Sequence, residues 1–330
     1  MTKQSYAQAG VDIHRAEAFV ERLKLNAKRQ GHKKLWPALG GYAAILELST
    51  TSGMAFTTDG VGTKLLVAHE LKKYDTIGID LVAMCANDLI CVGAKPEIFL
   101  DYYAVGQLED NQADQIMTGI IEGCDQTGML LIGGETAELP GLYEPGHYDL
   151  AGFAAGRVES HHLMSADKIK PGQSLIGVSS SGIHSNGFSL ARRVLGTKEE
   201  YLKELLKPTA LYVNAVNEVQ STLTASLTGM AHITGGGWRN LLRLNENVGY
   251  YIEDPLPVPD IFKTIGKEVE LLEMYKTFNM GLGLALIVQD NVEQVISILK
   301  SNGHHAKKIG VVTDKAMSIE CKGLPFKLGE

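Results

Sequence analysis

Short apolar runs alternate with helical patterns along the first half of the chain. Residues 64–73 and 110–127 place apolar side chains at helical spacing and predict two helices. A further amphipathic helix is expected within the first 40 residues, where Val11, Phe19 and Leu23 stand among charged side chains. Four runs between residues 43 and 158 have the length and composition of β-strands: AAILEL, EIFLDYYAV, MLLIG and YDLAGFAAGRV.

The second half continues this alternation after a polar stretch with a Pro-Gly pair at 164–173. We place a domain boundary there, which gives expected domains of residues 1–165 and 166–330. Strands are predicted at 174–179, 248–252, 283–288 and 307–313, and helices at 187–195, 209–226, within 259–276 and at 291–301. The mixture predicts an α/β or α+β fold.

Composition narrows the class of protein. A length of 330 residues fits two domains at about 150 residues each. The net charge of -7 provides no broad basic surface, so neither nucleic acid nor an anionic membrane is an expected partner. The 4 cysteines form no C-x-x-C pair and are expected to be reduced core thiols. We find no apolar signal region and no apolar run near the roughly 18 residues of a membrane span, and we expect a cytoplasmic protein.

The common nucleotide-binding and hydrolase motifs do not occur: there is no G-x-x-x-x-G-K-[ST] loop, G-x-S-x-G elbow or H-E-x-x-H helix. Acidic residues instead stand in glycine-rich, apolar segments. In TTDGVGTK, Asp59 ends a strand, and Gly60 and Gly62 precede Thr63 and Lys64 at the start of a helix. This order suits a phosphate held by backbone N–H groups, with Asp59 on its Mg²⁺. The alternative is a turn in which Asp59 caps the helix.

The segment GIDLVAMCANDL predicts a buried helix that contains Asp80, Asn87 and Asp88. At 100° per residue, Asp80 and Asn87 fall within about 20° of each other on the helix surface. A carboxylate in so apolar a helix is costly unless it is paired or binds a metal. Two interpretations stay open: a Mg²⁺ site shared with Asp59, and a satisfied structural network.

A third acidic position follows the apolar run of LLIGGETAELP. Gly133 and Gly134 lead there into Glu135 and Thr136. Glu135 is a candidate to complete an oxygen-only site for a hard cation. The alternative is an ordinary junction between a strand and a turn.

Two segments of the second half, SSSGIHSNGFSLAR and HITGGGW, offer small residues and backbone donors that suit a phosphate. His184 is in addition a candidate acid or base near neutral pH. An ordinary helix cap at Ser185 and a flexible turn at the glycine triplet are the alternatives. The candidate residues are Gly182, His184, Ser185, Asn186, Thr234, Gly235, Gly236 and Gly237. Oxygen ligands in one half and anion-binding loops in the other suggest Mg-nucleotide chemistry on a phosphorylated small molecule.

At these same residues the sequence resembles the phosphoribosylformylglycinamidine cyclo-ligase family, the aminoimidazole ribonucleotide synthetases of purine biosynthesis. The similar motifs are DGVGTK, GIDLVAMCANDL with its following G-A-x-P, FLDYYA, GGETAELPG, YDLAGFAAG, SSSGIHSNGFSL and HITGGG. YAQAGVDI near the start and YKTFNMGLGLALIV near the end extend the resemblance over almost the whole chain.

The resemblance implies a two-domain α/β protein that dimerises through its N-terminal sheets and has a C-terminal mixed sheet flanked by helices. It also implies that ATP and Mg²⁺ are used to close the imidazole ring of formylglycinamidine ribonucleotide, with release of ADP and phosphate. In this interpretation the formyl oxygen attacks the γ-phosphorus, and an amidine nitrogen then displaces phosphate.

Residue roles follow from the motifs that match. Asp59, Asp88 and Glu135 are assigned to Mg²⁺ or its waters, with Asp80 and Asn87 in support. Lys64, and more weakly Lys24, are assigned to the triphosphate, and His184 to proton transfer. The nucleotide is expected at Gly60, Gly62, Thr63, Asn87, Gly133, Gly134 and Thr136. The ribose phosphate is expected at 182–187 and 234–237.

Two departures from the family pattern stand out. His14-Arg15-Ala16-Glu17 replaces an acidic, glycine-containing stretch, and Ala43 replaces a glycine in the loop 40–44, which is expected to cover the nucleotide. The alternatives for function are another ATP-using relative, such as thiamine-phosphate kinase, and a non-catalytic nucleotide-binding protein. No Cys precedes Cys85 and the chain ends in LPFKLGE, which disfavours selenophosphate synthetase and the hydrogenase-maturation relative.

Overall fold

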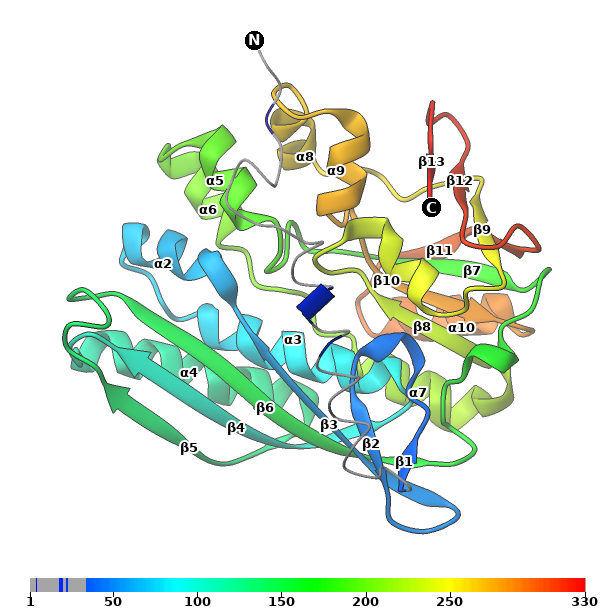
Figure 1. The fold of residues 1–330 in the computed structure, drawn as a ribbon, viewed down its shortest axis with the longest axis horizontal. Coiled ribbons are helices and arrows are strands. Elements are labelled where there is room, and N and C mark those ends of the chain that lie inside the picture. Colours follow the sequence, from blue (N-terminus) through cyan, green and yellow to red (C-terminus); the bar gives the residue numbers. More distant parts are fainter. Residues whose placement is uncertain (1–3, 5–17, 20–21, 23–33, 330) are drawn as a thin grey trace.

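The computed structural model describes Gln4, residues 18, 19 and 22, and residues 34–329. Two β-sheets, one from each half of the chain, stand with helices between them and around them (Figure 1). The expected fold class is therefore confirmed. Of the predicted helix near the N-terminus, only residues 18, 19 and 22 are described, and these three are helical. Lys24 and the stretch His14–Glu17 lie outside the described residues.

The N-terminal sheet has six strands in the order β1-β2-β3-β6-β4-β5. Only β4 and β5 run parallel to each other, and the other neighbours are antiparallel. The strands are β1 (Leu35–Trp36), β2 (Ala44–Glu47), β3 (Ser52–Gly60), β4 (Lys95–Val105), β5 (Leu130–Glu138) and β6 (Tyr148–Glu159). A short 3-10 turn, η3 (Leu39–Gly41), connects β1 to β2.

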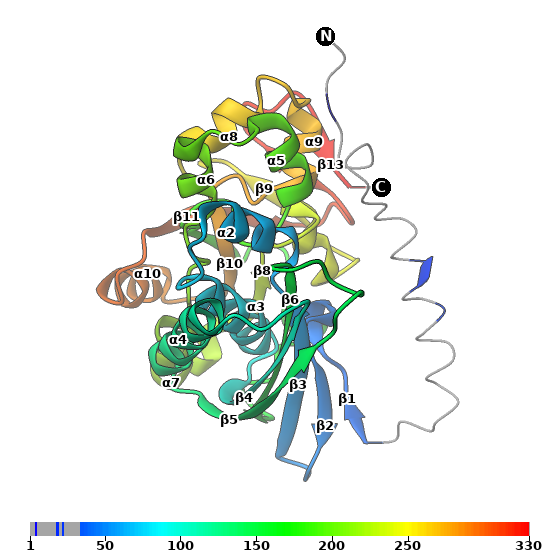
Figure 2. The same ribbon diagram turned by 90° about the vertical axis from the view of Figure 1, so that its left-hand side faces the viewer.

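Helices cover one face of this sheet, as Figure 2 shows. They are α3 (Ile77–Cys91) and α4 (Asp110–Thr127), while η4 (Gly62–Lys64) and α2 (Leu65–Leu71) follow β3 and contact helices of the second half. Almost every residue of α3 is buried, because this helix packs on β3 and β6 with one side and on the C-terminal half of the chain with the other. A helix that is apolar all round is typical of such a central position.

The opposite face of the N-terminal sheet presents large apolar side chains. Phe56, Leu100, Ile132 and Phe153 come from four different strands and are between 37% and 58% exposed. They line a shallow cavity of about 560 Å³ together with the loop 41–44. Contiguous apolar surface of this kind marks an interaction site more often than a free surface.

The C-terminal sheet has seven strands in the order β13-β12-β9-β11-β7-β10-β8. All neighbours are antiparallel except β12 and β9. The strands are β7 (Ser174–Ser179), β8 (Leu227–His232), β9 (Gly249–Ile252), β10 (Leu282–Val288), β11 (Ala306–Thr313), β12 (Ile319–Cys321) and β13 (Lys327–Leu328).

Helices of the second half surround this sheet, with α7 packed against both α10 and α3. The α-helices are α5 (Phe188–Leu195), α6 (Glu199–Leu205), α7 (Val213–Leu223), α8 (Asp260–Ile265), α9 (Leu271–Thr277) and α10 (Val292–Ser301). The 3-10 segments are η5 (Ala166–Lys168), η6 (Thr224–Ser226) and η7 (Gly237–Arg243).

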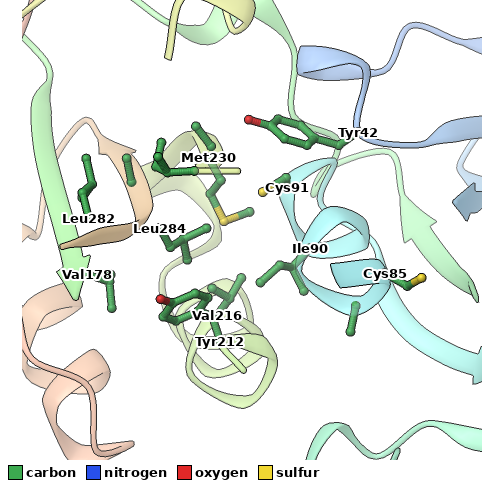
Figure 3. Packing of buried hydrophobic residues seen from close by; sticks show 14 of the residues in the cluster. Tyr42, Cys85, Ile90, Cys91, Val178, Tyr212, Val216, Met230, Leu282 and Leu284 are labelled. Carbon is green, nitrogen blue, oxygen red and sulfur yellow. The ribbon is translucent and has the colours of Figure 1, made fainter. Parts of the chain in front are cut away.

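The two halves share one buried interface. Figure 3 shows Ile90 and Cys91 of α3 on one side, and Met230 of β8 and Leu284 of β10 on the other. Tyr42, from the loop 40–44, joins the same cluster and is 6% exposed. This packing brings the C-terminal end of α3 close to the C-terminal end of β8. The residues at these two ends form the site.

The four cysteines are free and buried, which confirms the prediction of reduced core thiols. Within the described residues, no helix is both long and apolar enough to cross a membrane.

Candidate functional site

The ends of three elements meet between the two sheets. Asp59 lies at the end of β3, Asp88 lies on α3 and His232 ends β8. His232 Nδ1 donates to Asp88 Oδ1 over 2.9 Å, and the Tyr42 hydroxyl donates to the His232 backbone carbonyl oxygen over 3.2 Å. His232 thus connects the C-terminal sheet to α3 and to the loop 40–44.

The two carboxylates of this site, Asp59 and Asp88, both have raised pKa values. Burial and the nearby Asp88 raise the pKa of Asp59 to about 6, although the Gly60 N–H donates to Asp59 Oδ1 over 2.8 Å. Burial also raises the pKa of Asp88, in spite of His232 and Arg243. Two desolvated carboxylates, of which Asp88 disfavours the ionisation of Asp59, form a site that a cation would stabilise.

Lys64 and Asp80 form an ion pair inside the protein. The distance from Lys64 Nζ to Asp80 Oδ2 is 2.8 Å, and both side chains are 0% exposed. Lys64 Nζ also donates to the backbone carbonyl oxygens of His184 and Lys207, at 3.1 and 2.6 Å. Asp80 accepts the Ser185 hydroxyl at 3.1 Å. Lys64 and Asp80 thus bind each other and the loop that carries His184, and their expected roles at the triphosphate and the metal stay predictions.

Asn87 is used in the same structural way. Its Nδ2 donates to the Ala210 carbonyl oxygen over 2.9 Å, and its Oδ1 accepts the Tyr212 N–H over 3.1 Å. Asp80 and Asn87 do lie on one side of α3, as the helical spacing predicts, but that side faces the segment 207–212. The satisfied network is the interpretation that this geometry supports for both residues.

The loop 180–187 holds His184 in an unusual backbone conformation, with φ of 66°. The Ser181 N–H donates to His184 Nε2 over 3.2 Å, so the neutral ring carries its proton on Nδ1. Burial, then His232 and Lys64, lower the pKa of His184 well below its ordinary value. The neutral His184 ring therefore carries a free N–H at Nδ1, and the expected acid or base role of this residue stays a prediction.

The loop 233–237 lies directly beside the first one. A methyl group added to Gly235 would approach Asn186 Oδ1 to 3.0 Å, and one added to Gly237 would approach the Tyr275 carbonyl oxygen to 2.2 Å. Gly236 and Gly237 also have positive φ, at 120° and 55°. Glycine is required here by both close packing and backbone conformation, so the triplet is more than a flexible turn.

Several buried nitrogen atoms in these two loops and next to them have no hydrogen-bond partner. Buried polar atoms are nearly always paired in proteins, so a group of unpaired nitrogens indicates a binding site. The atoms are His184 Nδ1, Asn186 Nδ2, His232 Nε2, Arg239 Nε and Asn240 Nδ2. Each can offer an N–H group to an anion or a carbonyl oxygen, and His232 Nε2 does so when its ring is protonated.

Glu135 does not join Asp59 and Asp88 within this chain. It lies exposed on β5, in register with Tyr102, Ala151 and then Gly60, which places it three strands from the end of β3 or about 14 Å away. Gly133, Gly134 and Thr136 share this remote strand. The expectation of one cation held by Asp59, Asp88 and Glu135 is not met among the described residues.

A buried carboxylate that the sequence analysis did not assign lies nearer. Asp101 on β4 is separated from Asp59 only by Gly152 of β6, two strand spacings or about 10 Å. Asp101 is 7% exposed, and burial raises its pKa. A methyl group on Gly134 would lie 2.2 Å from Asp101 Oδ1, which accounts for that glycine.

His232, Arg239, Asn240 and Arg243 were also not predicted. His232 has a signal in the sequence, since it ends the short apolar run LTGMAH directly before the glycine triplet. The other three follow that triplet on η7. The described residues contain no ready cluster of three or more acidic, His or Cys side chains around one metal position. Thr63, also a predicted binding residue, lies near Ser189, with 3.2 Å between the two hydroxyl oxygens.

Comparison with known proteins decides the family. The chain is 43% identical over 331 residues to the phosphoribosylformylglycinamidine cyclo-ligase of Caldanaerobacter subterraneus subsp. tengcongensis, covering 94% of this chain and 97% of that protein. The cyclo-ligase of Fusobacterium nucleatum is 44% identical, covering 93% and 96% of the two chains. This chain belongs to the phosphoribosylformylglycinamidine cyclo-ligase family. The family predicted from the motifs is confirmed.

The two halves match separate family domains. Residues 40–158 match the AIR synthase related protein N-terminal domain, and residues 170–322 match the C-terminal domain. Among solved structures, a protein from Thermus thermophilus has a TM-score of 0.65 at 19% identity, covering 91% of this chain and 96% of that one. A thiamine monophosphate kinase from Aquifex aeolicus has a TM-score of 0.59 at 18% identity, covering 83% and 90%. These structural likenesses show a shared fold.

Proposed function

We propose that this chain closes the imidazole ring of phosphoribosylformylglycinamidine to give aminoimidazole ribonucleotide, with conversion of ATP to ADP and phosphate. The observation that carries the proposal is the identity of 43% to a cyclo-ligase over nearly the full length of both chains. The site supports it, since an acidic pair and a set of unpaired donors lie together between the two sheets.

The reaction needs activation because a formamide carbonyl is a weak electrophile and its oxygen leaves poorly. In the proposed course, the formyl oxygen attacks the γ-phosphorus of ATP and the bond to ADP breaks. An amidine nitrogen then adds to the activated carbon and loses a proton, and phosphate departs with the former formyl oxygen. Phosphoryl transfer depends mostly on positioning and on neutralisation of charge.

Asp59 and Asp88 are the residues that fit a magnesium ion. They are hard oxygen ligands, burial raises the pKa of both, and Asp88 adds to the rise at Asp59. Mg²⁺ bound there would neutralise the triphosphate oxygens. His232 orients the Asp88 carboxylate through its hydrogen bond of 2.9 Å, as partners of ligating carboxylates commonly do. Gly60, Gly62 and Thr63 follow Asp59 directly and remain the proposed nucleotide contacts of that loop.

The loops 180–187 and 233–237 are the proposed position of the other substrate. Asn279 fixes the first loop by donating to the carbonyl oxygens of Gly182 and Ile183, at 2.9 and 3.2 Å. Asn240 Oδ1 fixes the second by accepting the Thr234 N–H at 2.9 Å. His184 Nδ1–H then stands as a neutral donor to a substrate oxygen, a use of histidine that does not require titration at neutral pH.

Lys64, Asp80 and Asn87 are proposed to position this site without touching substrate. Their hydrogen bonds end on Ser185 and Thr209 and on the backbone of His184, Ala210 and Tyr212. They fix the loop 180–187 relative to α3. The distance between the acidic pair and the donor loops is thereby set before substrate binds.

A homodimer is part of the proposal, formed through the exposed face of the N-terminal sheet. That face is apolar across β3, β4, β5 and β6, and a flat patch of this kind can pair with its own copy about a twofold axis. A cytoplasmic location is proposed as well, and the four reduced thiols agree with a reducing compartment.

The activity is tested by incubating the purified protein with ATP and Mg²⁺, with and without phosphoribosylformylglycinamidine, and measuring ADP and diazotisable aminoimidazole. Substrate-dependent ADP with equal aminoimidazole is expected. A parallel reaction with thiamine monophosphate should give no ADP above background, and thiamine-dependent ADP without aminoimidazole would contradict the proposal.

A further inference from the structure

A second cavity, also of about 560 Å³, opens beside the loop 233–237. Its lining includes Gly236, Arg239, Asn240 and Arg243, with Glu246 on the same wall. Two guanidinium groups against one carboxylate leave the lining positive. Neither Arg239 nor Arg243 forms a salt bridge with any carboxylate of the part of the chain that the structure describes.

Asn240 directs a free donor into the space above Gly236. Its side chain is 0% exposed, and its Oδ1 is occupied by the Thr234 N–H at 2.9 Å. That contact identifies the oxygen of the amide, so the other end is Nδ2, which has no partner. A buried N–H without an acceptor is costly. A ligand oxygen would satisfy it.

Arg243 directs a guanidinium toward the same point. A methyl group built on Gly236 would lie 3.6 Å from Asn240 Nδ2 and 3.9 Å from Arg243 Nη2. The point above Gly236 is thus within reach of two donors from different turns of η7. Arg239 adds a buried Nε without a partner on the same cavity. Gly236 has no side chain to occupy the space, and its φ of 120° is one that other residues rarely adopt.

Charge separates this cavity from the neighbouring acidic site. Asp59 and Asp88 repel an anion that arrives without a cation, whereas Arg239 and Arg243 line the cavity with positive charge. The charge of Arg243 opposes the rise in pKa that burial causes at Asp88 and Tyr42. The arginine side therefore accepts an anion that carries no metal. Guanidinium groups suit a phosphate dianion because its oxygens accept several N–H donors at once.

We propose that Asn240, Arg239 and Arg243 bind the 5′-phosphate monoester of the ribonucleotide substrate above Gly236, while the metal-bound triphosphate occupies the acidic side. This rests on the proposed function for the identity of the substrate. The sequence led us to expect the phosphate at the glycine triplet, and the proposal adds three side chains that recognise the dianion. The ribose then lies between this phosphate site and the acidic site of Asp59 and Asp88, with the formyl group on the acidic side.

Two variants of opposite charge test the proposal in the active enzyme. Arg243→Met should raise the KM for the ribonucleotide about 10- to 100-fold, because a hydrogen bond to a charged group is lost, and should leave the KM for ATP within about twofold. Arg243→Lys keeps the charge and should recover part of the loss. Glu246→Gln should lower the ribonucleotide KM by up to about fivefold, since it removes a repelling charge.

Direct binding separates this inference from the proposed reaction. Ribose 5-phosphate and ribose are titrated into wild type, Arg243→Met and Asn240→Leu by calorimetry, with the unfolding temperature of each variant measured alongside. Binding of ribose 5-phosphate alone, lost in both folded variants, supports the phosphate site even where ring closure is absent. An active enzyme in which Arg243→Met changes the KM for ATP instead, or in which ribose 5-phosphate binds both variants as it binds wild type, overturns it. Arg157→Met, outside this cavity, is the matched control.

Discussion

The ammonium group of Lys64 lies 2.8 Å from the carboxylate of Asp80, and neither side chain is exposed to solvent. The pair joins the turn after β3 to α3, and through the backbone of His184 it joins both to the C-terminal half of the chain. Burial lowers the pKa of Lys64, and Asp80 opposes that shift. The contacts support the proposal that both residues position the site.

Lys64→Met should therefore destabilise the protein by about 3–5 kcal/mol, because it leaves a buried carboxylate without its partner. Urea unfolding measures the loss. The double variant Lys64→Met/Asp80→Asn removes both charges and should recover part of it.

Lys263→Met is the control for that experiment, since its pair with Asp260 is exposed on the surface and should contribute at most about 1 kcal/mol. If Lys64→Met kept full stability and raised only the KM for ATP, the ammonium would belong to the triphosphate and the structural role would be wrong.

Asp59→Asn should stabilise the metal-free protein above pH 6 by about 1–3 kcal/mol. The folded protein raises the pKa of Asp59 from 3.8 to about 6, so it binds this proton more tightly than the unfolded chain does. Ionised Asp59 thus destabilises the folded protein. The destabilisation is complete above pH 6, partial between pH 3.8 and pH 6, and absent below pH 3.8.

Thermal unfolding in EDTA across this pH range measures the difference between wild type and Asp59→Asn. The same variant should lose most of its turnover at saturating Mg²⁺. An equal stability gain at pH 3.5 and pH 8 would show that Asp59 ionisation is not its cause.

His184→Asn should retain more activity than His184→Ala, because the amide Nδ2 of Asn can replace the donor at Nδ1 and Asn tolerates a positive φ. The wild-type turnover should also show no inflection from His184 between about pH 6.5 and 9, since the pKa of this histidine is held well below its ordinary value.

Turnover of the three proteins as a function of pH is the measurement. An inflection in that range that disappears in His184→Asn would restore the acid or base role.

Phe153→Glu should convert a dimer into a monomer. Phe153 is 47% exposed on the outer face of the N-terminal sheet, where a charge would be buried in the proposed interface. Light scattering after size-exclusion chromatography measures the mass. Leu271→Glu changes a side chain of similar exposure on α9 and should leave the mass of the dimer unchanged. A monomeric wild type, or a dimeric Phe153→Glu, would contradict this interface.

Periodicity was sufficient for the strong elements of the fold. The helix predicted at 110–127 is α4, and the strand predicted at 174–179 is β7. Weaker signals were lost: β8 was not predicted, because LTGMAH is short, contains glycine and is buried on both faces. The predicted helix at 209–226 begins only at Val213, since residues 209–212 are needed to bind Asp80 and Asn87.

The site was predictable in its motifs and not in its partners. Helical spacing correctly placed Asp80 and Asn87 on one side of α3, but it could not show that Lys64 and the segment 207–212 form hydrogen bonds with them. The contacts to the segment 207–212 join residues more than 100 positions apart in sequence. Glu135 was assigned by its similarity of context to Asp59. Sheet order, which sequence alone does not reveal, separates the two by three strands.

The most direct test of the proposed reaction follows one oxygen atom. Phosphoribosylformylglycinamidine labelled with ¹⁸O in its formyl group is incubated with the enzyme, ATP and Mg²⁺, and ADP, aminoimidazole and the isotopic content of phosphate are measured together. We expect one ADP, one aminoimidazole and one phosphate per turnover, with the label in the phosphate. Unlabelled phosphate, or ADP without aminoimidazole, would contradict the proposed course.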